Sequence, residues 1–155
     1  MSGLDDLVLP GGVFHDLHAA NKRQLLGTLA GHAARLTGQD EAYVLDVVLE
    51  RERLGSTGFG AGTAIPHGKL DRLGRVVAIF AKLAAPVDFD ALDAQPVDLV
   101  VLMLAPVGAG ADHLKALARI SRALRDRMLV AKLRGSVSAD ALGALLTGDA
   151  HSRAA

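Results

Sequence analysis

The sequence has 155 residues and no formal net charge, because seventeen lysines and arginines are balanced by seventeen aspartates and glutamates. Half of the residues are apolar and 22% are charged, a composition that excludes a disordered chain and suits one domain with a substantial core. The balanced charge gives no overall attraction to nucleic acid or to anionic membranes, and the lack of cysteine excludes disulfides, thiol catalysis and cysteine-based zinc sites.

The start of the chain and its longest apolar run argue against export and against membrane insertion. Residues 1–6 are acidic where a signal peptide would be basic. The run from Leu99 to Val107 is far shorter than the roughly 18 apolar residues of a membrane span. We therefore expect a cytoplasmic protein with a single domain over residues 1–155, a core over about 7–147 and a frayed tail over 148–155.

The first elements predicted along the chain are a strand or loop and then a helix. Residues 7–14 are apolar on either side of a glycine pair and are consistent with an opening strand or a loop. Asn21, with Gln24 three residues later, has the spacing of a helix capping box. The helix that follows ends at Thr37-Gly38, and its apolar residues recur at helical spacing: Leu25, Leu26, Leu29, Ala33 and Leu36.

A second helix is predicted to begin after Asp40, which can cap it, and to stop at Gly55. Its apolar face consists of Val44, Leu45, Val48 and Leu49. Residues 50–53 form a charged run that closes the helix, and such a run is expected to be solvated.

The stretch from Gly55 to Lys69 is rich in glycine and places His67 between a proline and a glycine. Pro66 has a fixed φ and no backbone donor, while Gly68 can adopt conformations closed to other residues. Residues 63–65 resemble a short strand, so His67 is expected at a strand end, a common position for reactive side chains. From spacing alone, a surface-loop histidine without a role is an equal alternative.

Two almost continuously apolar runs, Arg75–Leu83 and Val97–Ala105, predict strands that are covered on both faces. Residues 71–74 form a turn before the first run. Residues 85–96, between the two runs, contain acids and two prolines without a clear period, and we expect a solvated loop there. The acids of residues 88–98 lack the spacing of a calcium loop.

The last third of the chain predicts three helices. Asp112 is expected to cap the first, whose buried stripe would consist of Leu114, Leu117, Ile120, Ser121 and Leu124. His113 falls in its first turn, where backbone N–H groups favour an anion. A short helix over 126–134 and another starting at Ser138 follow. Helices before, between and after two buried strands predict an α/β protein, specifically a three-layer α/β/α sandwich.

Several ordered motifs resemble a known family. Residues 50–58 (ERERLGSTG) and 64–69 (AIPHGK), together with later matches at 86–93, 95–99 and 112–117, are similar to the enzyme IIA components of the phosphoenolpyruvate-dependent phosphotransferase system. The likeness is to the fructose/mannitol type (type 2), and within it most closely to the nitrogen-regulatory branch. Relatives often carry asparagine where this chain has Ala61, which leaves a polar role for that residue open.

The resemblance implies a fold and a set of site residues. The fold would be a central mixed sheet with helices on both faces. His67 would be the phosphorylated nucleophile, carrying the phosphoryl group on Nε2. His113 would act as a donor to the phosphate or transition state, and Arg51 would stabilise the phosphate. No metal and no organic cofactor is implied.

The resemblance also implies partners. A histidine phosphocarrier protein of the HPr or NPr kind would supply the phosphoryl group, and the phosphorylation state would regulate partners such as potassium transport systems or sensor kinases. We expect the added charge beside Phe59 and Ile65 to weaken the docking of such a partner. One alternative is a sugar-uptake IIA component that passes phosphate to a IIB domain.

Two alternatives belong to other classes. A metal hydrolase would use His67, His113 and the acids of residues 88–98. A non-catalytic α/β binding module would need no histidine chemistry.

Overall fold

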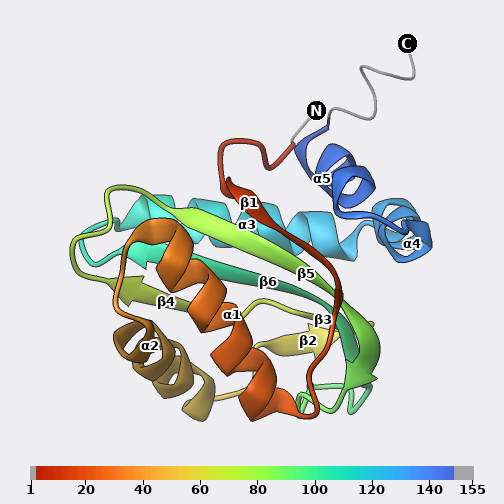
Figure 1. Ribbon diagram of the computed structural model, residues 1–155, viewed down its shortest axis with the longest axis horizontal. Helices are drawn as coiled ribbons and strands as arrows, with labels where there is room; N and C mark the ends of the chain where they lie inside the picture. Colours follow the sequence, from red (N-terminus) through yellow and green to blue (C-terminus); the bar gives the residue numbers. More distant parts are fainter. Residues whose placement is uncertain (1–2, 149–155) are drawn as a thin grey trace.

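The computed structural model describes residues 3–148 and has a six-stranded mixed sheet at its centre (Figure 1). The strands are β1 (Val8–Leu17), β2 (Gly58–Gly60), β3 (Thr63–Ala64), β4 (His67–Leu70), β5 (Val77–Val87) and β6 (Val97–Pro106). They lie in the order β1-β5-β6-β3-β2, and β4 also pairs with β6. The β1–β5, β3–β6 and β4–β6 pairs are parallel, whereas β5–β6 and β2–β3 are antiparallel. The opening segment is therefore a strand, and the mixed sheet implied by the resemblance is present.

Strands β3 and β4 lie on one line along β6. Thr63 pairs with Leu99 and His67 pairs with Met103, so the register is the same before and after the interruption. Pro66 has no N–H to give to the ladder, but its carbonyl still accepts a hydrogen bond from the Met103 amide (3.0 Å). As predicted, His67 follows the end of a short strand. It also begins a second strand that the sequence did not predict.

Helices cover both faces of the sheet (Figure 1). The helices α1 (Lys22–Thr37) and α2 (Glu41–Arg53) pack on one face, and α3 (Ala111–Arg125), α4 (Arg127–Gly135) and α5 (Ala139–Thr147) pack on the other. Alternate residues of β5 and β6 enter the two cores: Ile79 and Leu102 face α1 and α2, while Phe80 and Val101 face the other group. This double burial explains why both strands are almost continuously apolar, and the predicted three-layer sandwich is confirmed.

Most predicted helix starts are confirmed by their caps. The side chains of Asn21, Asp40 and Ser138 accept hydrogen bonds from the backbone amides of Gln24, Tyr43 and Ala141. Asp126 caps α4 in the same way.

The start of α3 differs from the prediction. Its N-cap is Gly110, which has a positive φ, and Asp112 lies inside the first turn without capping it. Leu114, expected in the buried stripe, is 66% exposed; the buried side is formed by His113, Ala116, Ile120 and Leu124. The helix starts two residues earlier than predicted and has no side-chain cap. The prediction of Asp112 as the cap was wrong because it relied on a residue type that favours helix starts.

The segment predicted as a solvated loop is partly wrong as well. Strand β5 continues through Pro86 to Val87, and Phe89 is fully buried in the core beneath α1. The acids on either side of Phe89 in the sequence led to the wrong prediction that this residue lies in a solvated loop. No helix within residues 3–148 is long and apolar enough to cross a membrane. The tail over 148–155, predicted to fray, lies outside the described residues except for Gly148.

Candidate functional site: a histidine pair at the edge of the sheet

His67 is held by its own backbone. Its Nδ1 lies 2.8 Å from the carbonyl oxygen of Ile65. A carbonyl can only accept, so Nδ1 carries the proton and donates it. The other ring nitrogen, Nε2, therefore carries the lone pair, and the ring is only partly buried. The arrangement fixes both the tautomer and the direction in which a nucleophilic nitrogen points.

The side chain of His113 lies beside that of His67. The two ring centroids are 5.7 Å apart, and the ring planes are inclined by 50°. The first turn of α3 carries His113, which is only 9% exposed, and its Nε2 is buried without a hydrogen-bond partner in the described structure. A buried unpaired nitrogen costs free energy, so its presence next to an available nucleophile marks a place where a ligand atom can satisfy it.

Both histidines are biased toward their neutral forms. The pKa of His67 is lowered mainly by burial and also by the positive charge of Arg51, against the opposing effects of the Ile65 carbonyl and of Glu52. The pKa of His113 is lowered by burial, by His67 and by Lys69. At neutral pH the imidazole of His67 is therefore available as a nucleophile.

Arg51 reaches the same site from the end of α2. Its Nη1 donates to the carbonyl of Gly55 (2.9 Å), which keeps the guanidinium on the loop side of the helix, and its charge acts on His67. Helix α2 can approach β4 closely because Gly68 has no side chain: a Cβ there would lie 2.5 Å from Cγ1 of Val47. The structure thus places Arg51, His67 and His113, the three residues that the resemblance implies for the site, near one another.

Glu52 is a residue of the site that the sequence reasoning missed. The charged run over 50–53 was expected to be solvated, but Glu52 is buried. Its carboxylate accepts from the backbone amide (2.8 Å) and the hydroxyl (2.6 Å) of Thr57, and it pairs with Nζ of Lys22 at 2.9 Å. The helical period could have predicted the burial of Glu52, because Val44, Val48 and Glu52 are four residues apart and share the buried face of α2.

Four amides of the glycine-rich stretch donate hydrogen bonds to other groups of the protein. The amides of Gly55, Thr57, Gly58 and Ala61 donate to the Glu52 carbonyl, the Glu52 carboxylate, Ser56 Oγ and Asp93 respectively. The sequence reasoning had treated this loop as a possible source of donors for a bound phosphate. These four amides are not free for that role.

The structure provides no ligand set for the metal-hydrolase alternative. His67 pairs with Met103 on β6. Asp98, one of the acids of that alternative, lies on the same strand five residues before Met103, which is roughly 16 Å along the strand. Within residues 3–148, no three histidine or acidic side chains gather as a metal ion would require.

Fold and site together define a small α/β protein that presents an available imidazole beside a second histidine and an arginine. The family described as "Phosphoenolpyruvate-dependent sugar phosphotransferase system, EIIA 2" matches residues 7–148, and the chain belongs to this family. It is therefore a component of a phosphotransferase system.

Individual relatives narrow the likeness. The nitrogen regulatory protein of Bradyrhizobium diazoefficiens is 53% identical over 143 residues, which covers 92% of this chain and 94% of that protein. The crystal structure of the nitrogen regulatory protein IIA-Ntr from Neisseria meningitidis superposes with a TM-score of 0.86 at 30% identity, covering 93% of this chain and 99% of that one. The IIA mannitol structure from Escherichia coli gives a TM-score of 0.72 at 25% identity, covering 89% and 98%. The chain thus resembles nitrogen-regulatory members of the family.

Proposed function

We propose that this protein carries a phosphoryl group on Nε2 of His67 and regulates partner proteins through its phosphorylation state. The observation that supports this most directly is the hydrogen bond from His67 Nδ1 to the Ile65 carbonyl, because it leaves Nε2 with its lone pair and fixes its direction. The donor would be a histidine phosphocarrier protein of the HPr or NPr kind. Such an exchange would take place in the cytoplasm.

In the proposed step the lone pair of His67 Nε2 attacks the phosphorus of the carrier's phosphohistidine in line. A new P–N bond forms on His67, the P–N bond to the carrier breaks, and the carrier's imidazole leaves with the bonding electron pair. The His67 ring becomes positively charged while it keeps its Nδ1 proton, which the Ile65 carbonyl stabilises. The reaction needs no water and no metal ion to balance.

Two further side chains support the transferring group. The orphaned Nε2 of His113 can donate to an equatorial oxygen when it carries the ring proton, and the guanidinium of Arg51 offsets the negative charge. Removal of one such donor typically slows a reaction by about 10²–10³-fold. His113 is therefore proposed as a donor that does not itself carry phosphate.

Regulation would act through charge. A phosphoryl group adds about −1.5 to −2 charges near neutral pH. The exposed apolar residues next to the site are Leu54 (75% exposed), which follows the helix end carrying Arg51, and Leu114 (66% exposed), which follows His113. A partner that docks on them would meet the phosphate and prefer the unmodified protein. Ile65, which the sequence placed in this surface, is only 3% exposed and cannot contribute.

The nitrogen-regulatory relatives favour regulated targets such as potassium transport systems or sensor kinases over sugar uptake. The alternative is a sugar-uptake IIA component that passes its phosphate to a IIB domain, and the likeness to the mannitol IIA protein supports it. Transfer from the labelled protein to a IIB domain would favour the alternative.

The test is reconstitution with phosphoenolpyruvate, enzyme I and the phosphocarrier, followed by intact mass measurement. Wild type should gain one acid-labile phosphate, and His67→Ala should gain none. His18→Ala, which removes an exposed histidine away from the site, is the matched control and should label like wild type. Full labelling of His67→Ala would overturn the proposal.

A further inference from the structure

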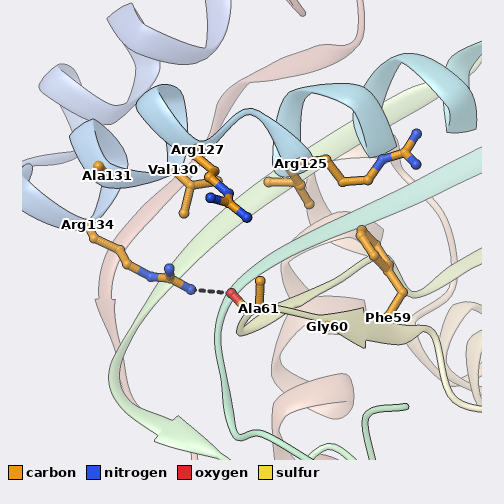
Figure 2. A pocket seen from close by; sticks show the side chains of 9 residues that line it. Phe59, Gly60, Ala61, Arg125, Arg127, Val130, Ala131 and Arg134 are labelled. Atoms are coloured by element: carbon orange, nitrogen blue, oxygen red, sulfur yellow. Dashed lines mark hydrogen bonds between the residues drawn. The ribbon is translucent and has the colours of Figure 1, made fainter. Parts of the chain in front are cut away.

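A second concave site lies on the α3 side of the sheet, away from the histidine pair. It is a pocket of about 730 Å³ between the β2–β3 hairpin and the corner where α3 meets α4 (Figure 2). Helix α3 connects the two sites: His113 lies in its first turn and Leu124 lines the pocket near its last, eleven residues on or roughly 16 Å away. A ligand here would leave the histidines accessible.

The lining of the pocket combines an apolar floor with a cationic rim. Leu124 and Val130 are buried at its base, and the partly exposed ring of Phe59 forms one side. The charged residues among those that line it are all arginines: Arg125, Arg127 and Arg134. A pocket of this volume accommodates a small organic molecule, because ligand sites are commonly clefts of about 300–1,000 Å³ with few polar groups.

The three arginines are not equally available. Arg134 is committed to the protein: it donates to Asp98 and to the carbonyl of Ala61, a bond drawn in Figure 2. Arg127 makes no hydrogen bond or ion pair with the described residues 3–148, and Figure 2 shows its guanidinium directed into the space above Ala61. Arg125 makes one long contact (3.4 Å) to the Ser121 carbonyl.

The nearby acids do not neutralise this rim. Asp98 is paired with Arg134, and Asp126 accepts from the Met128 and Leu129 amides as the cap of α4. Asp93 accepts from the Ala61 and Gln95 amides, which lower the pKa of its carboxyl, and it is not among the residues that line the pocket. The free guanidinium of Arg127 therefore faces the pocket without a carboxylate.

We propose that this pocket binds a nucleotide-like anion, with its ring against Phe59 and the apolar floor and its phosphate on Arg127. An aromatic ring and an arginine accept both parts of such a ligand, since a planar ring stacks on an aromatic face and a guanidinium forms bidentate hydrogen bonds with phosphate. A small ligand suits the pocket better than a protein, because none of the large, exposed apolar side chains within residues 3–148 lines it. The proposal goes beyond the phosphoryl-carrier function and does not depend on it.

The test uses the full-length ¹⁵N-labelled protein with three probes: AMP, adenosine and inorganic phosphate. AMP at millimolar concentration should shift the amide signals of Gly60, Ala61 and Ala131 and leave that of His113 unchanged. Adenosine lacks the charge and phosphate lacks the ring, so the affinity of each should be lower than that of AMP by a factor of about ten or more.

Variants assign the effect to the pocket. Arg127→Gln should weaken AMP binding about tenfold, because it removes a charge-assisted contact made by an exposed side chain that has no hydrogen-bond or ion-pair partner among residues 3–148. Arg122→Gln changes an exposed arginine on the preceding helix α3 that does not line the pocket; it is the matched control and should bind like wild type. His67→Ala should also bind normally. No shifts with AMP, equal binding by Arg127→Gln and Arg122→Gln, or shifts centred on His113 would each overturn the proposal.

Discussion

Removal of the buried carboxylate of Glu52 should both destabilise the protein and loosen His67. Glu52 accepts two hydrogen bonds from Thr57 and pairs with Lys22, with only 4% of its side chain and 20% of that of Lys22 exposed. Breaking a buried pair by removing one partner costs about 3–5 kcal/mol, because the remaining groups stay buried and unpaired. We expect Glu52→Ala to lower the free energy of unfolding by about that amount.

A milder change separates charge from hydrogen bonding. The amide of Glu52→Gln can still accept from the Thr57 amide and donate to its hydroxyl, so the main loss is the charge that faces Lys22, about 1–3 kcal/mol. Glu50→Ala is the matched control on the same helix, because Glu50 is 62% exposed and pairs with Arg53 alone among residues 3–148. Its cost should stay below about 0.5 kcal/mol.

The effect should reach His67 through the backbone. The Thr57 carbonyl accepts the Ile65 amide (3.1 Å), and the Ile65 carbonyl accepts His67 Nδ1 (2.8 Å). If Thr57 moves, the carbonyl that selects the His67 tautomer moves with it. In Glu52→Ala, ¹⁵N chemical shifts of the ring should show a smaller fraction with the proton on Nδ1, which lowers the fraction with a free Nε2.

Urea unfolding and ring ¹⁵N shifts, read on the same samples, test the two halves separately. If Glu52→Ala costs no more than Glu50→Ala, the buried clamp has no energetic role. If Glu52→Ala is destabilised as expected but keeps the Nδ1 proton of His67 as in wild type, the clamp does not act on the histidine.

Three further outcomes follow from the structure. Gly68→Ala should destabilise by about 1–3 kcal/mol in urea unfolding, because the added methyl would lie 2.5 Å from a side chain of α2, whereas Gly74→Ala, with nothing within 4 Å, should cost far less. Ala61→Asn should stabilise by about 0.5–1 kcal/mol, since Ala61 has a φ of 56° that asparagine tolerates better; an unchanged urea midpoint would contradict this. Folding lowers the pKa values of His67 and His113, so below the unfolded histidine pKa of about 6.5 the unfolded chain binds more protons than the folded protein. The contribution of these histidines to stability should therefore be complete above that pH and be lost as the pH falls through the lowered pKa values. His113→Asn should reduce this loss of stability at low pH in melting curves; a pH dependence like that of wild type would exclude His113 as a cause.

Much of the fold was predictable because local chemistry and final environment agree. The runs over 75–83 and 97–105 are almost continuously apolar, and strands β5 and β6 are covered by helices on both faces. Asn21 and Asp40 are good caps that do cap helices. The candidate site residues came from the resemblance to a known family instead, because the proline and glycine around His67 alone left a surface-loop histidine without a role as an equal alternative.

The failures arose where a residue's type and its environment disagree. Asp112 favours helix caps, but the chain enters α3 at Gly110 through a positive φ that no sequence period reports. Phe89 is surrounded by acids in sequence, yet its ring fills the core beneath α1, because the side chains of its neighbours Asp88 and Asp90 point away from it to solvent. The pocket beside Phe59 joins segments about sixty residues apart, so no local pattern could contain it.

Glu52 shows why such disagreements gather at the site. Its place on the buried face of α2 follows from the spacing of Val44 and Val48, but a carboxylate can occupy that face only if donors meet it. One set of donors comes from Thr57, five residues later, and the other from Lys22, thirty residues earlier, so the tertiary fold must exist before the charge can be buried. A purely apolar contact would have cost less to bury, but it would not have directed the Thr57 amide and hydroxyl. The Ile65 amide donates to the Thr57 carbonyl, and the Ile65 carbonyl orients His67. A buried charge at position 52 therefore gives the loop a defined direction that packing alone would not supply.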